Sequence, residues 1–303
     1  MELSFSMQDF LPSEEKCVKI LLQTRWRGKI TCVHCKSDTI SSNGTRRTFY
    51  HKYVCRACGK SFTERTGTIF DASKVPLREW VYIAKELQRN ISIKKINEEL
   101  GHEYKNVHTI AHKIMNSIFE KRFLETLSGK VEIDEMYIAA GQKGSKTLKR
   151  PARKRGLKLR GRGTYDKDKP PIVGSVRRKG KLSLQVLPNM RKRNVNKVLK
   201  RVNKEADVYT DDFKAYLPLA KKGYRHKTVN HSEKEYARGD AHTNTIEGAF
   251  QGLRHFLDTF KGVCKKNLHL YVALFENNYN NRDKDSASYL NYFLKDNIFA
   301  SVK

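Results

Sequence analysis

Apolar residues recur along this chain with two different periods. Residues 1–25 predict a short helix, and the alternation of apolar and polar positions after it predicts short strands over residues 26–70. From Pro76 the spacing becomes helical. It predicts three helices, at residues 77–90, 92–100 and 103–119.

These three helices occupy a region that we place at residues 71–125. Ser92 is the expected N-cap of the second helix, and Gly101 is a break before the third. This pattern is typical of a helix-turn-helix, in which the last helix enters the major groove of DNA. The candidates for base or phosphate contact are therefore Lys105, Asn106, His108 and Thr109. A helical linker without a role in DNA binding is the alternative.

Residues 128–285 have the pattern of an α/β domain with a mixed sheet, followed by a tail at 286–303. β-branched residues and turn signals predict strands at 131–138, 170–180, 181–190 and 207–212, and a helix at 194–206. A later helix over residues 243–260 has an apolar stripe of Ile246, Ala249, Phe250, Leu253, Leu257 and Phe260.

One acid stands at the border of that apolar stripe. Glu247 lies one residue, about 100° of helix rotation, from the buried face. Arg254 follows two turns later, so the two side chains project on the same side of the helix. Taken alone, this pattern favours an ordinary surface ion pair over a carboxylate directed into an active site.

Composition adds a partner to this picture. The chain has 303 residues, with 61 Lys plus Arg against 32 Asp plus Glu, a formal charge of +29 that favours a nucleic-acid partner. A basic amphipathic helix for an anionic membrane is missing, and the longest apolar runs are too short to span one. Met1 to Phe10 has no basic segment typical of a secretory signal, so we expect an intracellular protein.

Much of the positive charge lies between the first two strands of the α/β domain. The basic insertion, residues 141–163, has ten Lys or Arg, five Gly and no acid. Such a segment cannot bury a core, and on DNA it would add affinity without reading sequence. We expect Arg153, Lys154 and Arg155 to contact DNA; a nuclear-localisation signal is the alternative interpretation.

Four of the six cysteines form two CxxC pairs. The pairs are Cys32/Cys35 and Cys55/Cys58, with 19 residues between them. This spacing is typical of a zinc ribbon, and four thiolates leave no open position for water, so the zinc would be structural. Two disulfides are the alternative, which a basic intracellular chain disfavours. Cys17 and Cys264 have no such spacing and are expected to be ordinary thiols.

Acidic residues also stand where a strand would present them. Asp134 interrupts an apolar strand and is followed by Glu135, while Asp211 ends a strand and is followed by Asp212. Together with Glu247 they provide the carboxylates that two-metal phosphoryl chemistry requires, with Mg²⁺ as the preferred hard ion. The pattern does not show whether Asp134 or Glu135, or whether Asp211 or Asp212, is the functional acid. Each acid alone could also be a helix cap.

The order of these motifs resembles the DDE transposases of ISXO-type insertion sequences, relatives of the eukaryotic Merlin elements. The matching blocks are CVHC, CRAC, KSFTERTGTIFDASKVPLREW, VEIDEMYI, PIVGSVRRKGK, VYTDDFKAY, HTNTIEGAFQGLR and FENNYNNR. The resemblance implies an RNase H-like fold and assigns Asp134, Asp211 and Glu247 as catalytic metal ligands. It also implies that Arg254 approaches DNA phosphate and that Asn244 has a supporting role. The sequence departs from the family at Ala139, Ala140 and Gly141, where glycines are expected, which affects the shape of that loop.

The function implied by this resemblance is DNA transposition. The expected activity is binding of terminal inverted repeats, followed by cleavage and strand transfer with two Mg²⁺ or Mn²⁺ ions; the zinc is structural. The expected partners are element ends, target DNA and at least one more copy of the chain, in the nucleoid of a prokaryote or the nucleus of a eukaryote. A DNA-binding regulator with a zinc ribbon and helix-turn-helix, or a domesticated RNase H-like nuclease, are the alternatives.

Overall fold

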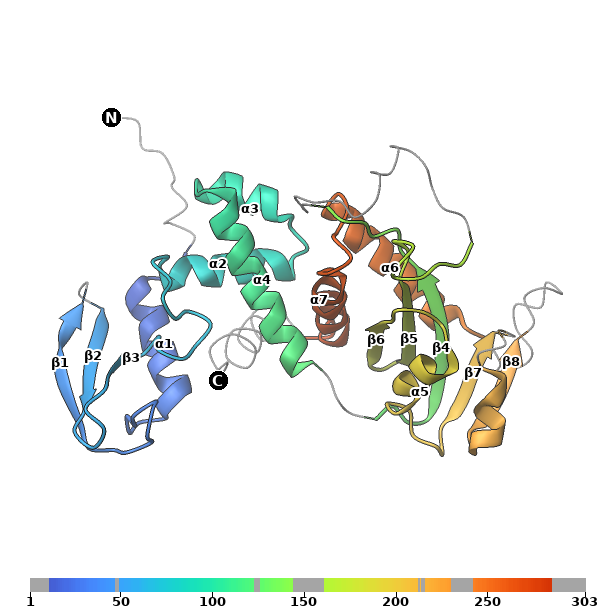
Figure 1. The fold of residues 1–303 in the computed structure, drawn as a ribbon, viewed down its shortest axis with the longest axis horizontal. Helices are drawn as coiled ribbons and strands as arrows, with labels where there is room; N and C mark the ends of the chain where they lie inside the picture. Colours follow the sequence, from blue (N-terminus) through green and yellow to red (C-terminus); the bar gives the residue numbers. More distant parts are fainter. Residues whose placement is uncertain are drawn as a thin grey trace. The chain divides into compact units, whose positions relative to one another are not determined.

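The computed structural model describes residues 11–46, 49–122, 126–143, 161–211, 213, 216–229 and 242–284. The chain divides into two compact units (Figure 1). The first comprises the residues up to Lys121 and those from Lys284, and the second runs from Arg122 to Asp283. No helix in the described part of the chain is both long and apolar enough to cross a membrane.

The first unit begins with a helix and a small antiparallel sheet. Its elements are helix α1 (Glu14–Trp26) and strands β1 (Ile40–Arg46), β2 (Tyr50–Cys55) and β3 (Ser61–Thr63), paired in that order. The core of this part is small: Cys32, Tyr53, Cys55 and Phe62 are buried together. Cysteine is half of that cluster, so the apolar side chains alone provide little stability.

Three helices follow, as the helical spacing predicts. They are α2 (Leu77–Gln88), α3 (Ile93–Leu100) and α4 (Tyr104–Lys121). The hydroxyl of Ser92 accepts a hydrogen bond from the backbone N–H of Lys95 at 3.3 Å, so its predicted role as N-cap is confirmed. Gly101 ends α3 with a φ of +68°, a left-handed conformation that glycine adopts without a Cβ clash.

Glu14 of α1 connects the small sheet, which we call the ribbon sheet (β1, β2 and β3), to helix α2. Pro76 precedes α2 and makes no side-chain cap, and the Glu14 carboxylate instead accepts hydrogen bonds from the backbone N–H groups of Leu77 and Arg78 at 2.8 and 2.9 Å. The hydroxyl of Tyr50, on β2, donates to the same carboxylate. The start of α2 is therefore held by residues of both α1 and the ribbon sheet.

The second unit is built on a mixed five-stranded sheet with the order β6-β5-β4-β7-β8. Its strands are β4 (Lys130–Tyr137), β5 (Pro171–Arg177), β6 (Leu182–Val186), β7 (Asp207–Asp211) and β8 (Arg225–Val229). The first three pair antiparallel, whereas β7 runs parallel to β4 and β8 parallel to β7. The remaining elements are α5 (Lys192–Leu199), the 3₁₀ helix η2 (Leu217–Lys222), α6 (Asn244–Thr259) and α7 (Leu268–Asn280). This is an RNase H-like arrangement, as the resemblance implies.

Two details differ from the sequence-based expectation. Strand β8 is not predicted, because Val229 is its only buried residue and its other side chains are polar. The helix predicted at 194–206 ends at Leu199, because Val202 instead forms an isolated parallel bridge with Leu127. The backbone N–H of Leu127 donates to the Arg201 carbonyl at 2.8 Å, and that of Asn203 donates to the Leu127 carbonyl at the same distance.

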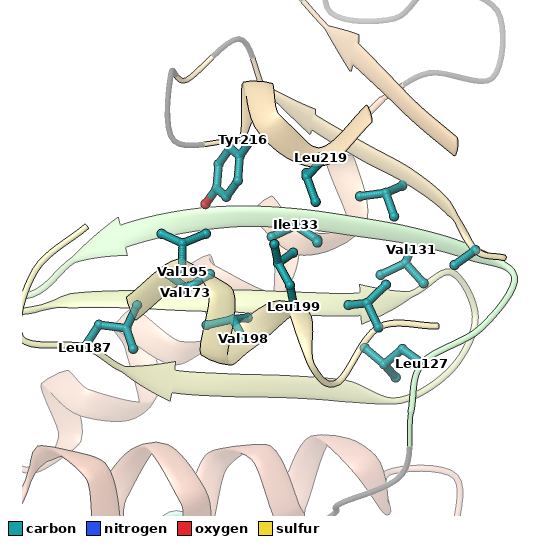
Figure 2. Packing of buried hydrophobic residues seen from close by; sticks show 13 residues of the cluster. Leu127, Val131, Ile133, Val173, Leu187, Val195, Val198, Leu199, Tyr216 and Leu219 are labelled. Carbon is teal, nitrogen blue, oxygen red and sulfur yellow. The ribbon is translucent and has the colours of Figure 1, made fainter. Parts of the chain in front are cut away.

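One face of the sheet is covered by α5 and η2 (Figure 2). Ile133 of β4 and Val173 of β5 pack there against Val195 and Val198 of α5, and the ring of Tyr216 lies beside them at the start of η2. This apolar cluster therefore lies on the face of β4 that points away from α6.

Helix α6 covers the opposite face at close range. Gly174 of β5 pairs with Asp134 of β4, and a Cβ built at Gly174 would lie 2.6 Å from Ile246 Cδ1 of α6. A side chain at this position would push the helix away from the sheet. The sequence uses glycine here to bring α6 close to the strand that carries Asp134.

Helix α7 covers β6 at the edge of the sheet. Asn280 accepts a hydrogen bond from the backbone N–H of Leu182 at 2.7 Å and donates to its carbonyl at 2.8 Å. The buried carboxylate of Glu276 accepts a bond from the Leu184 N–H at 2.6 Å. These side chains form hydrogen bonds with backbone groups of β6 that an edge strand otherwise leaves available for pairing with another chain.

Glu276 should make the stability of the second unit depend on pH. Burial raises the pKa of its carboxyl group to about 7, against the opposing effects of the Leu184 N–H and the charges of Arg201 and Arg122. Since the folded-state pKa lies above the unfolded-state value, this contribution is complete below the unfolded-state pKa and is lost as pH rises through about 7. Relative to wild type, the unfolding free energy of Glu276→Gln should therefore rise by about 3 kcal/mol between pH 4.5 and pH 8.

Urea unfolding at both pH values measures this difference. Glu205→Gln removes a charge at an exposed position of the same unit and serves as the control. Parallel pH profiles for wild type and Glu276→Gln would contradict the prediction.

Candidate active site and metal centres

Three carboxylates meet where β4 and β7 run side by side. Asp134, Glu135 and Asp211 each offer an oxygen, and these oxygens all lie within 4.8 Å of one another. The parallel pairing of Glu132 with Tyr209 brings Asp134 of β4 level with the end of β7, where Asp211 stands. We call these three residues the acidic cluster.

The acidic cluster is electrostatically unfavourable without a cation. Burial, together with the charges of Asp211, Glu135 and Glu247, raises the pKa of Asp134 to about 7, while the Glu135 N–H donates to Asp134 at 2.7 Å and opposes the shift. Burial likewise raises the pKa of Glu135 to about 7, with Asp211 adding to the effect. A hard divalent cation, which prefers carboxylate oxygens, would relieve this repulsion, so the donor set fits such an ion.

Glu135 has further partners on the η2 side of the sheet. The hydroxyl of Tyr216 donates to its Oε2 at 2.9 Å, and the guanidinium of Arg162 lies 3.7 Å from its Oε1. Arg162 belongs to the basic insertion and also lies over the ring of Phe213, 3.7 Å from its centroid. Sequence reasoning named neither Tyr216 nor Arg162, because only the fold brings them to β4.

Glu247 lies in the first turn of α6, on the exposed side of the helix. Its Oε1 accepts a hydrogen bond from the hydroxyl of Thr243 at 2.8 Å. Glu247 is not among the acids that meet within 4.8 Å, although its charge reaches Asp134 and raises that group's pKa. The structure thus brings Asp134, Glu135 and Asp211 together, whereas Glu247 lies outside this group on α6.

Arg254 lines an open cavity beside the acidic cluster. The cavity has a volume of about 570 Å³ and is also lined by Glu135, Tyr137 and Leu257. Arg254 lies on the exposed side of α6. Its guanidinium therefore borders the same hollow as one of the clustered acids.

The four CxxC thiols form a second centre, in the first unit. One ligand atom from each of Cys32, Cys35, Cys55 and Cys58 lies within 4.8 Å of the others. Cys32 Sγ is 3.7 Å from Cys58 Sγ, and Cys35 Sγ is 3.5 Å from Cys55 Sγ. These separations are too long for disulfides and suit sulfurs on the edges of a tetrahedron about 2.3 Å from a zinc ion. The thiol cluster therefore fits structural zinc.

The residues predicted for DNA contact on the third helix lie at the start of α4. Lys105, Asn106 and Thr109 are exposed and His108 is half-buried. Tyr104 is not among the residues predicted for DNA contact. Its side chain is 51 % exposed and lies beside His108, with ring centroids 5.7 Å apart. Arg153, Lys154, Arg155 and Asp212 lie outside the described residues.

Comparison with known proteins gives a consistent result across the chain. An ISXO2-like transposase domain matches residues 126–280, and a transposase zinc-ribbon domain matches residues 12–61. A protein in transposable element ISH50 of Halobacterium salinarum is 34% identical over 268 residues, 87% of this chain and 90% of that protein. A transposase-like protein of Haemophilus influenzae is 27% identical over 122 residues, 40% of this chain and 98% of that protein.

Proposed function

The chain belongs to the ISXO2-like transposase family, and from that premise we propose that it binds the terminal inverted repeats of an insertion sequence and catalyses metal-dependent strand cleavage and strand transfer. The observation that carries the proposal is the meeting of Asp134, Glu135 and Asp211 beside the cavity that Arg254 lines. We assign Asp134, Asp211 and Glu247 as the ligands of two Mg²⁺ ions.

Each group near the acidic cluster has a defined part in this reaction. When bound, the metal pair would acidify the attacking water or 3′-hydroxyl and stabilise the leaving oxygen. Asp134 and Asp211 provide oxygens from two adjacent strands, and Glu247 provides one from α6. Arg254 holds a DNA phosphate in the open cavity, which positions the scissile bond. Tyr216 and Arg162 hold Glu135, the third acid of the cluster.

Recognition of the DNA ends falls to the first unit. The zinc ribbon and the start of α4 provide cationic and aromatic side chains, and Glu14 ties α1, the ribbon and α2 together. Arg153, Lys154 and Arg155 of the basic insertion add contacts to phosphates. Because both ends of an element are processed together, the active species is a dimer or larger assembly on DNA.

A strand-transfer reaction tests this function directly. The purified full chain, incubated with labelled DNA that carries the inverted repeats flanking its gene and with a target plasmid, should give joined products in Mg²⁺. Omission of all added divalent ions should remove these products and leave end binding in a gel-shift assay, because the zinc bound by the four cysteines is retained. End binding without joined products in Mg²⁺ or Mn²⁺ would instead support a DNA-binding regulator.

The start of α4 yields a second prediction. Lys105→Ala should weaken binding to specific and unrelated DNA to a similar extent and reduce the slope of log K against log salt by about 1, because one phosphate contact is lost. Lys94→Ala is the matched control: Lys94 is an exposed lysine on α3 that pairs with Glu98. Fluorescence anisotropy over a salt series measures both slopes, and equal slopes for Lys105→Ala and wild type would exclude the phosphate contact.

A further inference from the structure

Glu132 is a fully buried acid two residues before Asp134, and neither the motifs nor the family resemblance assigns it a role. Its side chain is fully buried in β4. Because side chains alternate along a strand, Glu132 shares the α6 face of β4 with Asp134, two residues further on. A buried carboxylate is costly unless it is paired and hydrogen-bonded, so its partners explain its presence.

Those partners belong to the start of α6. Glu132 Oε2 accepts hydrogen bonds from the backbone N–H groups of Thr245 and Ile246 at 2.8 and 3.0 Å, and Oε1 accepts one from the Thr245 hydroxyl at 3.0 Å. Thr245 and Ile246 are the second and third residues of the helix, whose N–H groups usually bond the side chain of the N-cap residue. Glu132 therefore caps α6 from a neighbouring strand.

Arg178 completes this arrangement. Its Nε donates to Glu132 Oε1 at 2.7 Å, and its Nη2 donates to the His242 carbonyl at 2.9 Å, just before the helix. Nδ1 of His242 lies 3.3 Å from the same Glu132 oxygen, and the Arg178 guanidinium lies over the ring of Tyr209 on β7. The contacts of Glu132 and Arg178 therefore connect β4 and β7 to the residues on both sides of the α6 N-terminus.

Because Glu132 caps α6, the side chain of the N-cap residue Thr243 can form a different hydrogen bond. Thr243 is the N-cap of α6, yet its side chain makes no capping hydrogen bond. Its hydroxyl donates instead to Glu247 Oε1 at 2.8 Å, and Thr243 is 1 % exposed. A threonine that would ordinarily cap the helix is thus used to hold a carboxylate one turn further on.

We propose that Glu132 and Thr243 are positioning residues: Glu132 fixes the start of α6 against β4, and Thr243 orients Glu247 toward the metal ions held by Asp134 and Asp211. This proposal rests on the proposed function, in which Glu247 is a metal ligand. Residues that orient a ligand contribute strongly to metal affinity, and their loss typically lowers it by about 10- to 100-fold.

Direct Mn²⁺ binding to the full chain, measured by electron paramagnetic resonance without DNA, tests the positioning role. Thr243→Val keeps the shape of the side chain and removes the hydroxyl, and should weaken Mn²⁺ binding about tenfold. Thr243→Ser restores the hydroxyl and should bind Mn²⁺ as wild type does. A role in folding alone would change the amount of folded protein and leave the affinity of the folded fraction unchanged.

Glu132→Gln should weaken Mn²⁺ binding by a similar factor. The neighbours of its carboxylate on Arg178, Thr245 and Ile246 are all donors, so an amide NH₂ faces a donor in either orientation. Glu276→Gln is the matched control, since Glu276 is another buried acid that accepts a backbone N–H, but on α7 against β6. If Glu132→Gln does not fold, the Thr243 pair decides the test.

Wild-type Mn²⁺ affinity in Thr243→Val, or in folded Glu132→Gln, would overturn the positioning role. Failure of the proposed function has different signatures: wild type would give no joined products with the element ends, or Glu247→Gln would keep wild-type Mn²⁺ affinity and strand transfer, which would remove Glu247 from the metal ligands. Weakened binding in Thr243→Val and Glu132→Gln, with wild-type binding in Thr243→Ser and Glu276→Gln, supports the proposal.

Discussion

Replacement of Asp134 or Asp211 by asparagine, or of Glu247 by glutamine, should abolish strand transfer and leave binding of the element ends intact. Each change keeps the size of the side chain and removes the anionic oxygen that we assign to the metal. Since metal ions contribute several kcal/mol to transition-state stabilisation in phosphoryl transfer, we expect the rate to fall by about 10³-fold or more. Gel-shift and strand-transfer assays on the same preparations separate the two effects.

Asp134→Asn should also leave a signature in the metal-free protein. The pKa of Asp134 is raised to about 7, so above that pH the ionised group is held against the unfavourable effects of burial and of the neighbouring acids. Removal of its charge should therefore raise the thermal midpoint of the metal-free protein at pH 8, while Mn²⁺ binding is lost. A variant that is more stable and yet inactive indicates a metal ligand. Loss of a structural residue would instead lower both the stability and the activity.

The matched control lies on the same strand as Asp211. Asp207 begins β7, at the opposite end from the acidic cluster, and its carboxylate is 4.0 Å from Arg225. Asp207→Asn should leave strand transfer and Mn²⁺ binding near wild type. Full Mg²⁺-dependent activity in Asp134→Asn or Asp211→Asn would refute the assignment of the active site.

Glu135 requires the same experiment, because it meets Asp134 and Asp211 in the acidic cluster. The family resemblance assigns Asp134 rather than Glu135, and the geometry brings both together. Glu135→Gln should lower activity less than Asp134→Asn does. The reason is that Tyr216 and Arg162 hold the Glu135 carboxylate on the side of the sheet that η2 covers, opposite α6. The reverse order of effects would make Glu135 the principal ligand.

Loss of zinc should unfold the ribbon and abolish binding to the element ends. The buried cluster of this part is small and half of its residues are cysteine, whereas structural zinc in zinc-finger peptides contributes about 10–16 kcal/mol in apparent binding free energy. Cys55→Ser should therefore give protein without zinc and without a gel shift. The acidic cluster is built from other elements, in the second unit, so its Mn²⁺ binding should persist.

Cys264→Ser is the control for this change, because Cys264 is a half-buried thiol outside the four-cysteine cluster. It should retain one zinc per chain, measured by atomic absorption, and normal end binding. A Cys55→Ser protein that still shifts DNA as wild type does would show that the ribbon is not required for end recognition.

The sequence by itself determined the features that depend on local spacing. Each CxxC pair sets two sulfurs within one turn, so the zinc centre could be predicted before any fold was known. The apolar stripe of α6 and the N-cap Ser92 follow from helical periodicity and from one side-chain hydrogen bond, and both are present in the structure. Charge likewise favoured a nucleic-acid partner without reference to the fold.

Only the tertiary structure decided which distant side chains meet. The parallel register of β4 and β7 brings Asp134 and Asp211 together and adds Glu135, a choice that strand alternation alone leaves open. Strand β8 carries no apolar alternation, and it is defined by its pairing with β7. Glu132 caps α6 from a strand far away in the sequence, and no local pattern encodes such a contact, because hydrogen bonds between distant segments exist only after the sheet and helix have packed.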